Sequence, residues 1–330
     1  MTDEAAREQA SSPAPPDHGG VLVVDKPAGV TSHDVVDVVR RRFRTQAVGH
    51  LGTLDPGASG LLALALGTAT RCVPVWQGGE KTYEATLRLG VVTSTQDLAG
   101  EVLERHPVEV TEAQVRAASA GLVGEIDQVP PMVSALHVRG ERLYRLARRG
   151  ITVERAARRV RVAAWDWLGF ELPLARFRVR CSGGTYVRTL AHDLGARLGT
   201  GGALEKLRRL RSEPFDLSRA VTVQELIELG ADAAWACAGV PLEDALATLP
   251  TVRLDSDGAR AIGFGASVAV DAARTVGLPE GAGPRSILIA DEAGGCLALG
   301  EFVRDPDRGG VASPHVVFPW AVREGRPRVA

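Results

Sequence analysis

The chain has 330 residues, of which 45% are hydrophobic and 24% are charged, and its formal net charge is −1. These values are ordinary for a soluble globular protein with one large and one small core, and no apolar run approaches the roughly 18 residues that a membrane span needs. The four cysteines are scattered singly, which favours reduced thiols in the cytoplasm and argues against structural zinc.

The N-terminal part of the chain predicts a tail followed by the start of the first domain. Residues 1–20 lack the apolar core of a signal peptide and are typical of a disordered segment. The run VLVVDKP predicts a short strand that Pro27 stops. Thr31 or Ser32 then caps a helix that runs to about Phe43.

The stretch GHLGTLDPGASG carries a single carboxylate, Asp55, among four glycines and just before the apolar run LLALAL. Asp-Pro-Gly is ordinary turn chemistry, and a turn is the simplest explanation. A phosphate-binding P-loop is excluded because Ala58 stands where that motif needs a lysine. The remaining interpretation is a loop that presents Asp55 as a working carboxylate. The apolar run itself predicts a buried strand.

Three further elements follow in chain order. Residues 81–90 alternate strictly and predict a strand with Tyr83 on its inward face, where a core tyrosine is the default interpretation. A capped helix is predicted over 111–121, and a second helix over 140–150.

A block of positive charge overlaps the second of these helices. From His137 to Val162 the chain has nine arginines and two glutamates. The planar fork of arginine suits phosphate, so this block is consistent with a nucleic-acid interface. A solvated helix face explains it equally well, and the residues alone leave both interpretations open.

The second half of the first domain predicts a strand, a glycine turn and then a helix that begins at Thr185. Tyr186 and Arg188 therefore lie in an exposed first turn beside a glycine-rich loop. Further along, short β-like runs are broken by Gly, Pro and Asp. This change predicts a first domain over 21–248 and a small β domain over 249–330.

Six ordered motifs between about residues 20 and 220 are, in chain order, DKPAGVTSHDVV, VGHLGTLDPGASGLLALALGTATR, KTYEATLRLG, PPMVSALHVRGERLYRLARRG, CSGGTYVRTLAHDLG and LEKLRRLRSEPF. Together they resemble the TruB family of tRNA pseudouridine synthases, which modify uridine 55 in the T loop of tRNA. The resemblance implies the pseudouridine synthase fold: an α+β domain with a mixed, largely antiparallel central sheet and flanking helices. The C-terminal part resembles, more loosely, a small PUA-like RNA-binding domain.

The resemblance also implies a role for each matched residue. Asp55 is the expected catalytic residue, Tyr83 the residue that stacks on the target base, and Arg188 the partner of the aspartate. The other expected members of the substrate site are Tyr186 in the pocket, Leu207 in its apolar wall, His50 near the flipped nucleotide, and Lys26 with Pro27 in support.

Three positions depart from the family pattern. His137 stands where a lysine is more usual, Val133 where an aromatic residue is more usual, and Ser94 where an aspartate is common, although Asp97 and Gly100 remain. These departures concern contacts with RNA and leave the expected chemistry unchanged.

The implied reaction breaks the C1′–N1 bond of uridine, turns the base over and rejoins it through C5. No atoms are gained and no redox step occurs, so neither a cofactor nor a metal is expected. A carboxylate can serve this reaction by attacking or stabilising the sugar carbon, by attacking C6 of the base, or by abstracting a sugar proton, and the sequence does not choose among these.

The motifs make physical sense for a base flipped out of the RNA stack. Gly52, Gly57 and Gly60 leave room for the base to approach the backbone. The opposite charge of Arg188 keeps Asp55 ionised, and Tyr83 replaces lost stacking, which contributes about 1–3 kcal/mol per base.

Two other functions remain open on the sequence. A nucleoside or glycoside hydrolase needs a second acid as proton donor, and Asp97 is the one nearby candidate. A non-catalytic protein that binds or folds RNA needs the basic block but not Asp55, Tyr83 and Arg188 together. The expected partner is the T stem-loop of tRNA, with the protein acting as a monomer in the cytoplasm and without a membrane.

Overall fold

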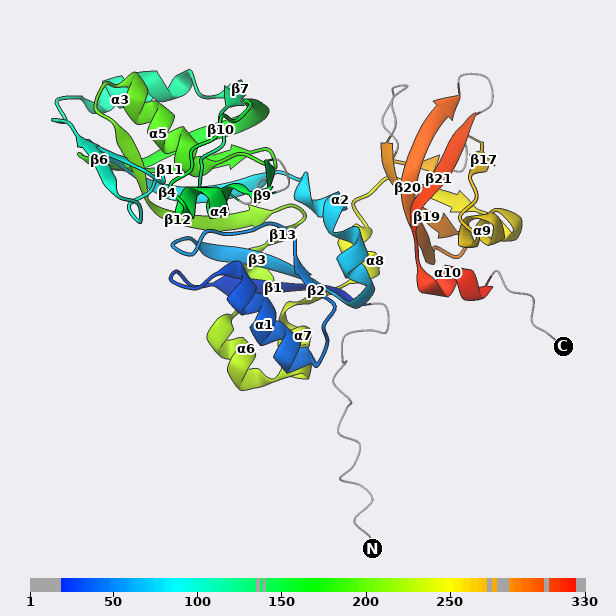
Figure 1. Cartoon of the computed structure of the whole chain (residues 1–330). Coiled ribbons are helices and arrows are strands. Elements are labelled where there is room, and N and C mark those ends of the chain that lie inside the picture. The colour runs from blue at the N-terminus through cyan, green and yellow to red at the C-terminus, as the bar shows by residue number, and fades with distance from the viewer. Residues whose placement is uncertain are drawn as a thin grey trace, which may run out of the picture.

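The computed structural model describes residues 19–134, 137–138, 141–271, 275–277, 285–305 and 309–324. Apart from its last two residues, the tail expected over 1–20 lies outside them. Figure 1 shows two bodies, a large one built by the chain up to α8 (Leu242–Leu246) and a smaller one built by the C-terminal part. A large sheet organises the first body, and a six-stranded sheet organises the second.

Eleven strands form the large sheet: β1 (Gly20–Lys26), β2 (Val48–His50), β3 (Ser59–Leu66), β4 (Lys81–Leu89), β7 (Gly124–Gln128), β10 (Arg158–Glu171), β11 (Leu174–Cys181), β12 (Gly202–Ser212), β13 (Phe215–Asp216), β14 (Val221–Thr222) and β15 (Gly239–Pro241). Their order is β14-β1-β3-β12-β4-β11-β10-β7, with β15, β2 and β13 paired to β1, β3 and β12. The pairs β1–β14 and β3–β12 are parallel, and the other pairs of this sheet are antiparallel. The expected α+β fold with a mixed, largely antiparallel sheet is confirmed.

Helices and two small hairpins complete the first body. The helices are α1 (Ser32–Phe43), η1 (Gly67–Cys72), α2 (Val73–Gln77), α3 (Glu112–Ala120), α4 (Leu143–Arg148), α5 (Val187–Arg197), η2 (Leu217–Arg219), α6 (Val223–Leu229), α7 (Ala231–Ala238) and α8. The hairpins pair β5 (Val91–Thr93) with β6 (Val102–Arg105), and β8 (His137–Val138) with β9 (Glu141–Arg142). α1, α6 and α7 lie together beside β1, while α3 and α5 lie together over the β10–β11 end of the sheet (Figure 1).

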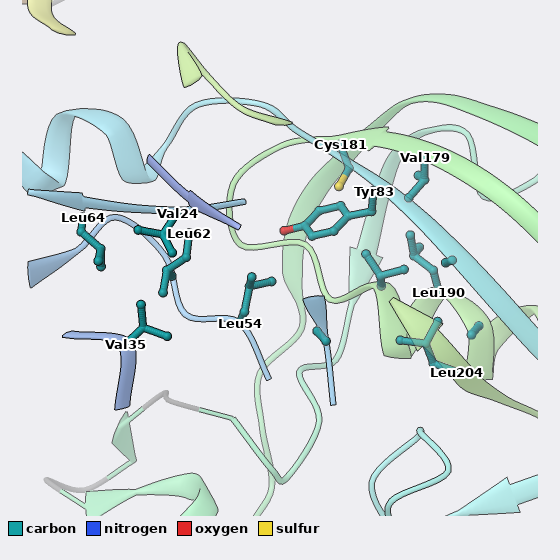
Figure 2. Packing of buried hydrophobic residues seen from close by; sticks show 14 of the residues in the cluster. Val24, Val35, Leu54, Leu62, Leu64, Tyr83, Val179, Cys181, Leu190 and Leu204 are labelled. Atoms are coloured by element: carbon teal, nitrogen blue, oxygen red, sulfur yellow. The ribbon is translucent and has the colours of Figure 1, made fainter. Parts of the chain in front are cut away.

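The main hydrophobic core lies between these helices and the sheet. Tyr83 belongs to it, and Figure 2 shows its ring between two groups of aliphatic side chains. The labelled members of the two groups are Val24, Val35, Leu54, Leu62 and Leu64 on one side, and Val179, Leu190 and Leu204 on the other. The core therefore reaches the loop that carries Asp55 through Leu54, the residue before it.

β4 has the two-residue alternation that its sequence predicts. Tyr83, Ala85 and Leu87 are buried on the inner face of the sheet, where they join the core. The residues between them are partly exposed on the outer face, where Glu84 binds Arg178 of the neighbouring strand at 2.6 Å. One strand thus presents a hydrophobic surface to the core and a charged surface to water.

The smaller body contains β16 (Thr251–Leu254), β17 (Val268–Val270), β18 (Thr275–Val276), β19 (Arg285–Asp291), β20 (Cys296–Asp305) and β21 (Gly309–Val317), with α9 (Ser256–Gly263) and α10 (Pro319–Glu324). The strand order is β17-β21-β20-β19-β16-β18. The boundary expected between 248 and 249 falls between α8 and β16. The likeness of this body to a PUA domain stays a prediction.

A second hydrophobic cluster joins the two bodies. It contains Leu61 and Phe215 of the large sheet together with Leu288, Leu299 and Phe318 of the C-terminal part. Near it, Arg71 of η1 donates a hydrogen bond of 2.9 Å from Nη1 to the carbonyl of Val317. The C-terminal body therefore packs against the first body through a hydrophobic interface.

The local predictions differ from the structure in two places. The segment predicted as a helix over 140–150 begins with strand β9, and the helix starts at Leu143. The helix expected to begin at Thr185 begins at Val187, because Tyr186 keeps an extended backbone as the N-cap. Among the described residues, no helix is long and apolar enough to span a membrane.

Candidate active site

Asp55 lies on the loop that connects β2 to β3. The amide of Ala58 donates to the carbonyl of Asp55 at 3.0 Å, which closes the turn that Asp-Pro-Gly predicts. The side chain of Asp55 is 40% exposed, between Leu54, which is buried, and Pro56, which is exposed. The two interpretations of this stretch are therefore compatible, since the turn presents the carboxylate.

Ser32 holds this loop from the first helix. Its hydroxyl donates to the carbonyl of Leu54 at 3.0 Å and accepts from the amide of Leu54 at 2.9 Å. Thr31 caps α1 and forms a capping box with Asp34. Since the side chain of Thr31 already accepts a hydrogen bond from the amide of Asp34 at the start of the helix, the hydroxyl of Ser32 can bind the backbone of Leu54, the residue next to Asp55.

Lys26 supports the other side of the loop. The residue is fully buried, and its ammonium group donates to the carbonyls of Pro27, Val30 and Pro56 at 2.9, 2.7 and 3.4 Å. Burial lowers its pKa to about 8, although Asp55 raises it. The structure therefore places Lys26 behind the Asp55 loop, bonded to backbone rather than lining the substrate pocket.

Arg188 binds Asp55 through two nitrogen atoms. Its Nε lies 2.8 Å from Oδ2 of Asp55, and its Nη2 donates to Oδ1 at 3.3 Å. The rest of the guanidinium donates to the carbonyls of Thr95 and Val133 at 2.9 and 2.8 Å, and the side chain is 4% exposed. Arg188 is thus fixed from three directions, which orients the carboxylate.

The environment of Asp55 raises its pKa above the ordinary value for aspartate. The largest cause is removal from bulk water, which the positive charge of Arg188 opposes and the negative charge of Asp97 reinforces. Asp97 is close because its Oδ2 lies 3.7 Å from Nε of the same arginine. Two carboxylates therefore share one guanidinium at this site.

The carboxylate opens into a pocket of about 360 Å³. Five of the expected residues, Asp55, Tyr83, Tyr186, Arg188 and Leu207, line it together. They come from the loop after β2, from β4, from the start of α5 and from β12. The other described residues that line it are Leu51, Gly52, Thr53, Leu54, Gln77, Lys81, Ser134, Gly184, Thr185, Val187 and Arg209.

His50 and Lys26 are not among the described residues that line this pocket. His50 ends β2, where it pairs with Leu64 of β3, just before the loop begins. Lys26 lies behind the loop, as described above. The expected contact between His50 and RNA therefore stays a prediction, and Lys26 acts on the pocket through the backbone.

Two aromatic side chains shape the pocket. Tyr83 is 8% exposed, and burial raises its phenol pKa, so that the ring is neutral at physiological pH. Tyr186 is fixed through its backbone, because its amide donates to Oε1 of Gln128 at 2.7 Å and its carbonyl accepts from Nε2 at 3.0 Å. With Leu207, the two rings give the pocket an apolar part of its lining.

Arg209 is a pocket residue that the sequence reasoning missed. It lies two residues after Leu207 on β12, and the two-residue period of a strand places both on one face. The sequence analysis predicts no strand for this segment, so it does not place Arg209 on the same face as Leu207. Gly60 also has a different purpose from the expected one: a Cβ there would lie 2.2 Å from the carbonyl oxygen of Arg209, so glycine permits β3 and β12 to meet.

The departures from the family pattern fall on two kinds of position. Ser94 closes the turn between β5 and β6, since its hydroxyl accepts from the amide of Glu101 at 3.1 Å. Val133 contributes its backbone carbonyl to Arg188, a contact that does not depend on side-chain type. The side chain of His137 lies outside the described residues.

In the described part of the chain, no three His, Cys, Asp or Glu side chains gather in a group able to hold a metal ion.

Comparison with known proteins identifies the family. Residues 40–187 match the model of the TruB family pseudouridylate synthase N-terminal domain, and residues 188–247 match that of the tRNA pseudouridylate synthase B C-terminal domain. The tRNA pseudouridine synthase B of Thermobifida fusca (strain YX) is 45% identical over 310 residues, which cover 91% of this chain and 98% of that protein. The chain belongs to the TruB family.

Other relatives and solved structures agree with this assignment. The tRNA pseudouridine synthase B of Ralstonia nicotianae (strain ATCC BAA-1114 / GMI1000) is 47% identical over 264 residues, covering 79% of this chain and 83% of that protein. A chain in the crystal structure of a Cbf5-Nop10-Gar1 complex superposes with a TM-score of 0.69 at 27% identity, over 91% of this chain and 85% of that one. As a TruB-type tRNA pseudouridine synthase, the protein is an isomerase that acts on RNA.

Proposed function

We propose that this TruB-family enzyme converts uridine 55 in the T loop of tRNA to pseudouridine, with Asp55 as the catalytic carboxylate. The observation that carries the proposal is the Asp55–Arg188 pair, held at 2.8 Å at the wall of a pocket that Tyr83 and Leu207 also line. The geometry combines one oriented acid with a slot for a planar base. Tyr186 completes the slot from the start of α5.

In the proposed reaction the uridine leaves the RNA stack and enters the pocket, where Tyr83 takes the place of its stacking neighbours. Asp55 supports cleavage of the C1′–N1 bond. The uracil ring turns over, C5 bonds to C1′, and the proton lost from C5 is balanced by one gained at N1. Product and substrate have the same atoms, so the step requires no external reactant.

The two rival functions receive less support from the geometry. A hydrolase requires a second acid at the bound sugar, yet among the described lining residues Asp55 is the one carboxylate. Asp97 is not among them: its Oδ1 accepts from the amide of Ala99 at 3.1 Å, and its Oδ2 lies 3.7 Å from Nε of Arg188. A purely RNA-binding protein has no need for a buried arginine that orients a single aspartate.

The proposal extends to the setting of the enzyme. The enzyme is expected to act as a monomer. All four cysteines are free thiols, which suits the reducing cytoplasm where tRNA is modified. Light scattering of the purified protein at assay concentration measures the first point.

The test is chemical mapping of pseudouridine in unmodified tRNA under single-turnover conditions. The wild-type enzyme should modify position 55 alone, and Asp55→Asn should bind tRNA but give no detectable product, because an amide neither attacks carbon nor accepts the proton. Asp97→Asn, the matched control, should still give product. Thermal melting must accompany the assay, since loss of a partner from a buried charge costs about 3–5 kcal/mol. A folded Asp55→Asn variant that modifies the T loop would disprove the mechanism.

A further inference from the structure

The guanidinium of Arg209 is buried behind the loop that carries Asp55. The side chain is 2% exposed, and its Nε donates to the carbonyl of Leu61 on β3 at 2.8 Å. Its Nη2 and Nη1 donate to the carbonyls of Gly52 and Thr53 at 2.9 and 3.5 Å. One rigid fork therefore joins the strand that follows the catalytic loop to two consecutive residues within it.

Arg209 is also the neighbour of the expected stacking residue. In the register of β12 and β4, Arg209 pairs directly with Tyr83. Burial is the main cause of the raised pKa of the Tyr83 phenol. The positive charge of Arg209 and its hydrogen bond to the same hydroxyl act in the opposite direction and lower the pKa. The side chain thus contacts both halves of the site, the loop of Asp55 and the ring of Tyr83.

A structural role alone does not explain a buried charge at this position. Removing a cation from water is unfavourable, and an apolar side chain of similar volume often stabilises a core as well or better. The guanidinium nevertheless donates three hydrogen bonds to backbone carbonyls, and two of the three carbonyls lie in the Asp55 loop. The arrangement therefore favours a purpose beyond filling space.

We propose that Arg209 is a positioning residue, which holds the carbonyls of Gly52 and Thr53 so that Asp55 stays against Arg188. The proposal rests on the proposed function, since it takes Asp55 as the reacting carboxylate. Arg209 itself does not touch the reacting atoms. Its effect is transmitted through two peptide units, from Thr53 to Asp55.

The adjacent residue provides a matched control. Arg208 lies on the outer face of the same strand, is 40% exposed, and binds both oxygens of Asp25 at 3.0 and 2.6 Å. Among the described residues, the hydrogen bonds and ion pair of its side chain go to Asp25 and not to the Asp55 loop. Arg208→Lys and Arg209→Lys therefore make the same chemical change on one strand, and only the second releases the loop.

The experiment compares single-turnover rates, tRNA affinity and the pH–rate profile of these two variants. Arg209→Lys keeps the charge but not the fork, so its rate should fall at least about tenfold while the tRNA Kd changes less than twofold. Arg208→Lys should stay within about twofold of wild type in both. Each rate is divided by the fraction of folded protein, which is measured by near-ultraviolet circular dichroism. If Arg209→Lys does not fold, Arg209→Gln is measured in its place.

The pH profile separates positioning from a general loss of structure. If the loop moves, Asp55 loses contact with Arg188, and the acidic limb of the profile should move to higher pH in Arg209→Lys. An unchanged limb, or a rate within twofold of wild type, would overturn the proposal. Activity in Asp55→Asn would instead overturn the proposed function, so the two failures are distinguishable.

Discussion

Charged side chains are exposed and paired with each other on the outer face of the central sheet, and buried on its inner face. On the outer face of β4 and β11, Glu84 binds Arg178 at 2.6 Å and Glu80 binds Arg180 at 3.1 Å, with all four side chains at least 31% exposed. On the inner face, the arginines and lysines are buried and most of their hydrogen bonds go to backbone carbonyls. Arg188 is the inner cation that also binds a carboxylate, Asp55.

The difference separates charges that face water from charges that surround the proposed catalytic residue. Exposed ion pairs contribute little, because water solvates their members almost as well when they are apart. Water cannot solvate a buried cation, which therefore depends on hydrogen bonds to its protein neighbours. Lys81, for example, donates to the carbonyls of Gln77 and Gly79 at 2.8 and 2.6 Å, and burial lowers its pKa to about 8. Lys81, Arg188 and Arg209 line the pocket with Asp55 as the one described carboxylate, so the lining is positive in a protein of net charge −1.

Replacement of Tyr83 by leucine tests the inner face most directly. Leucine fills part of the core but cannot stack, so the single-turnover rate should fall by about 5- to 150-fold, which corresponds to the 1–3 kcal/mol of one stacked base. The tRNA Kd should change little, because affinity is distributed over many phosphates. Tyr83→Phe, which keeps the ring, is the control. Equal rates for wild type and Tyr83→Leu would return Tyr83 to an ordinary core role.

The pH dependence of the rate tests the environment of Asp55. Removal from water raises its pKa above the ordinary 3.8, and the carboxylate is charged only above the raised value. The rate should therefore be constant at higher pH and fall about tenfold per pH unit below that pKa. Binding of tRNA measured in the same buffers separates this effect from loss of affinity. An acidic limb at or below 3.8 would show that Arg188 outweighs burial.

Much of this site could be predicted from the chain, because its signals are local or belong to recognisable motifs. The alternation around Tyr83 predicted its inward direction, and the Asp-Pro-Gly turn predicted how Asp55 is presented. The approach of Arg188 to Asp55 followed from the family resemblance alone. No local pattern indicates a contact between residues so far apart in sequence.

The features that were missed depend on long-range contacts and on irregular backbone. β12 pairs with β4 through shifts in register between Leu204 and Lys206 and again between Arg209 and Arg211, and such bulges disturb the alternation that identifies a strand. A long-range contact also explains why α5 begins at Val187 and not at Thr185 as predicted. The amide of Tyr186 donates to Gln128, a residue far away in the chain, and its carbonyl accepts from Gln128 as well as from the amide of Leu190 in α5.

The smallest effect is expected on the outer face, at the pair formed by Glu84 and Arg178. The two residues lie directly opposite each other on β4 and β11, and their side chains are 36% and 47% exposed. A double-mutant cycle with Glu84→Gln and Arg178→Gln should give a coupling free energy of unfolding of about 0.2–1 kcal/mol by urea denaturation. The single-turnover rate of each variant should stay within about twofold of wild type, because neither side chain faces the pocket. A coupling well above this range would mean that the outer ion pair contributes substantially to stability, and a large loss of rate would mean that the outer face contributes to the reaction. Either result would contradict the contrast between the two faces.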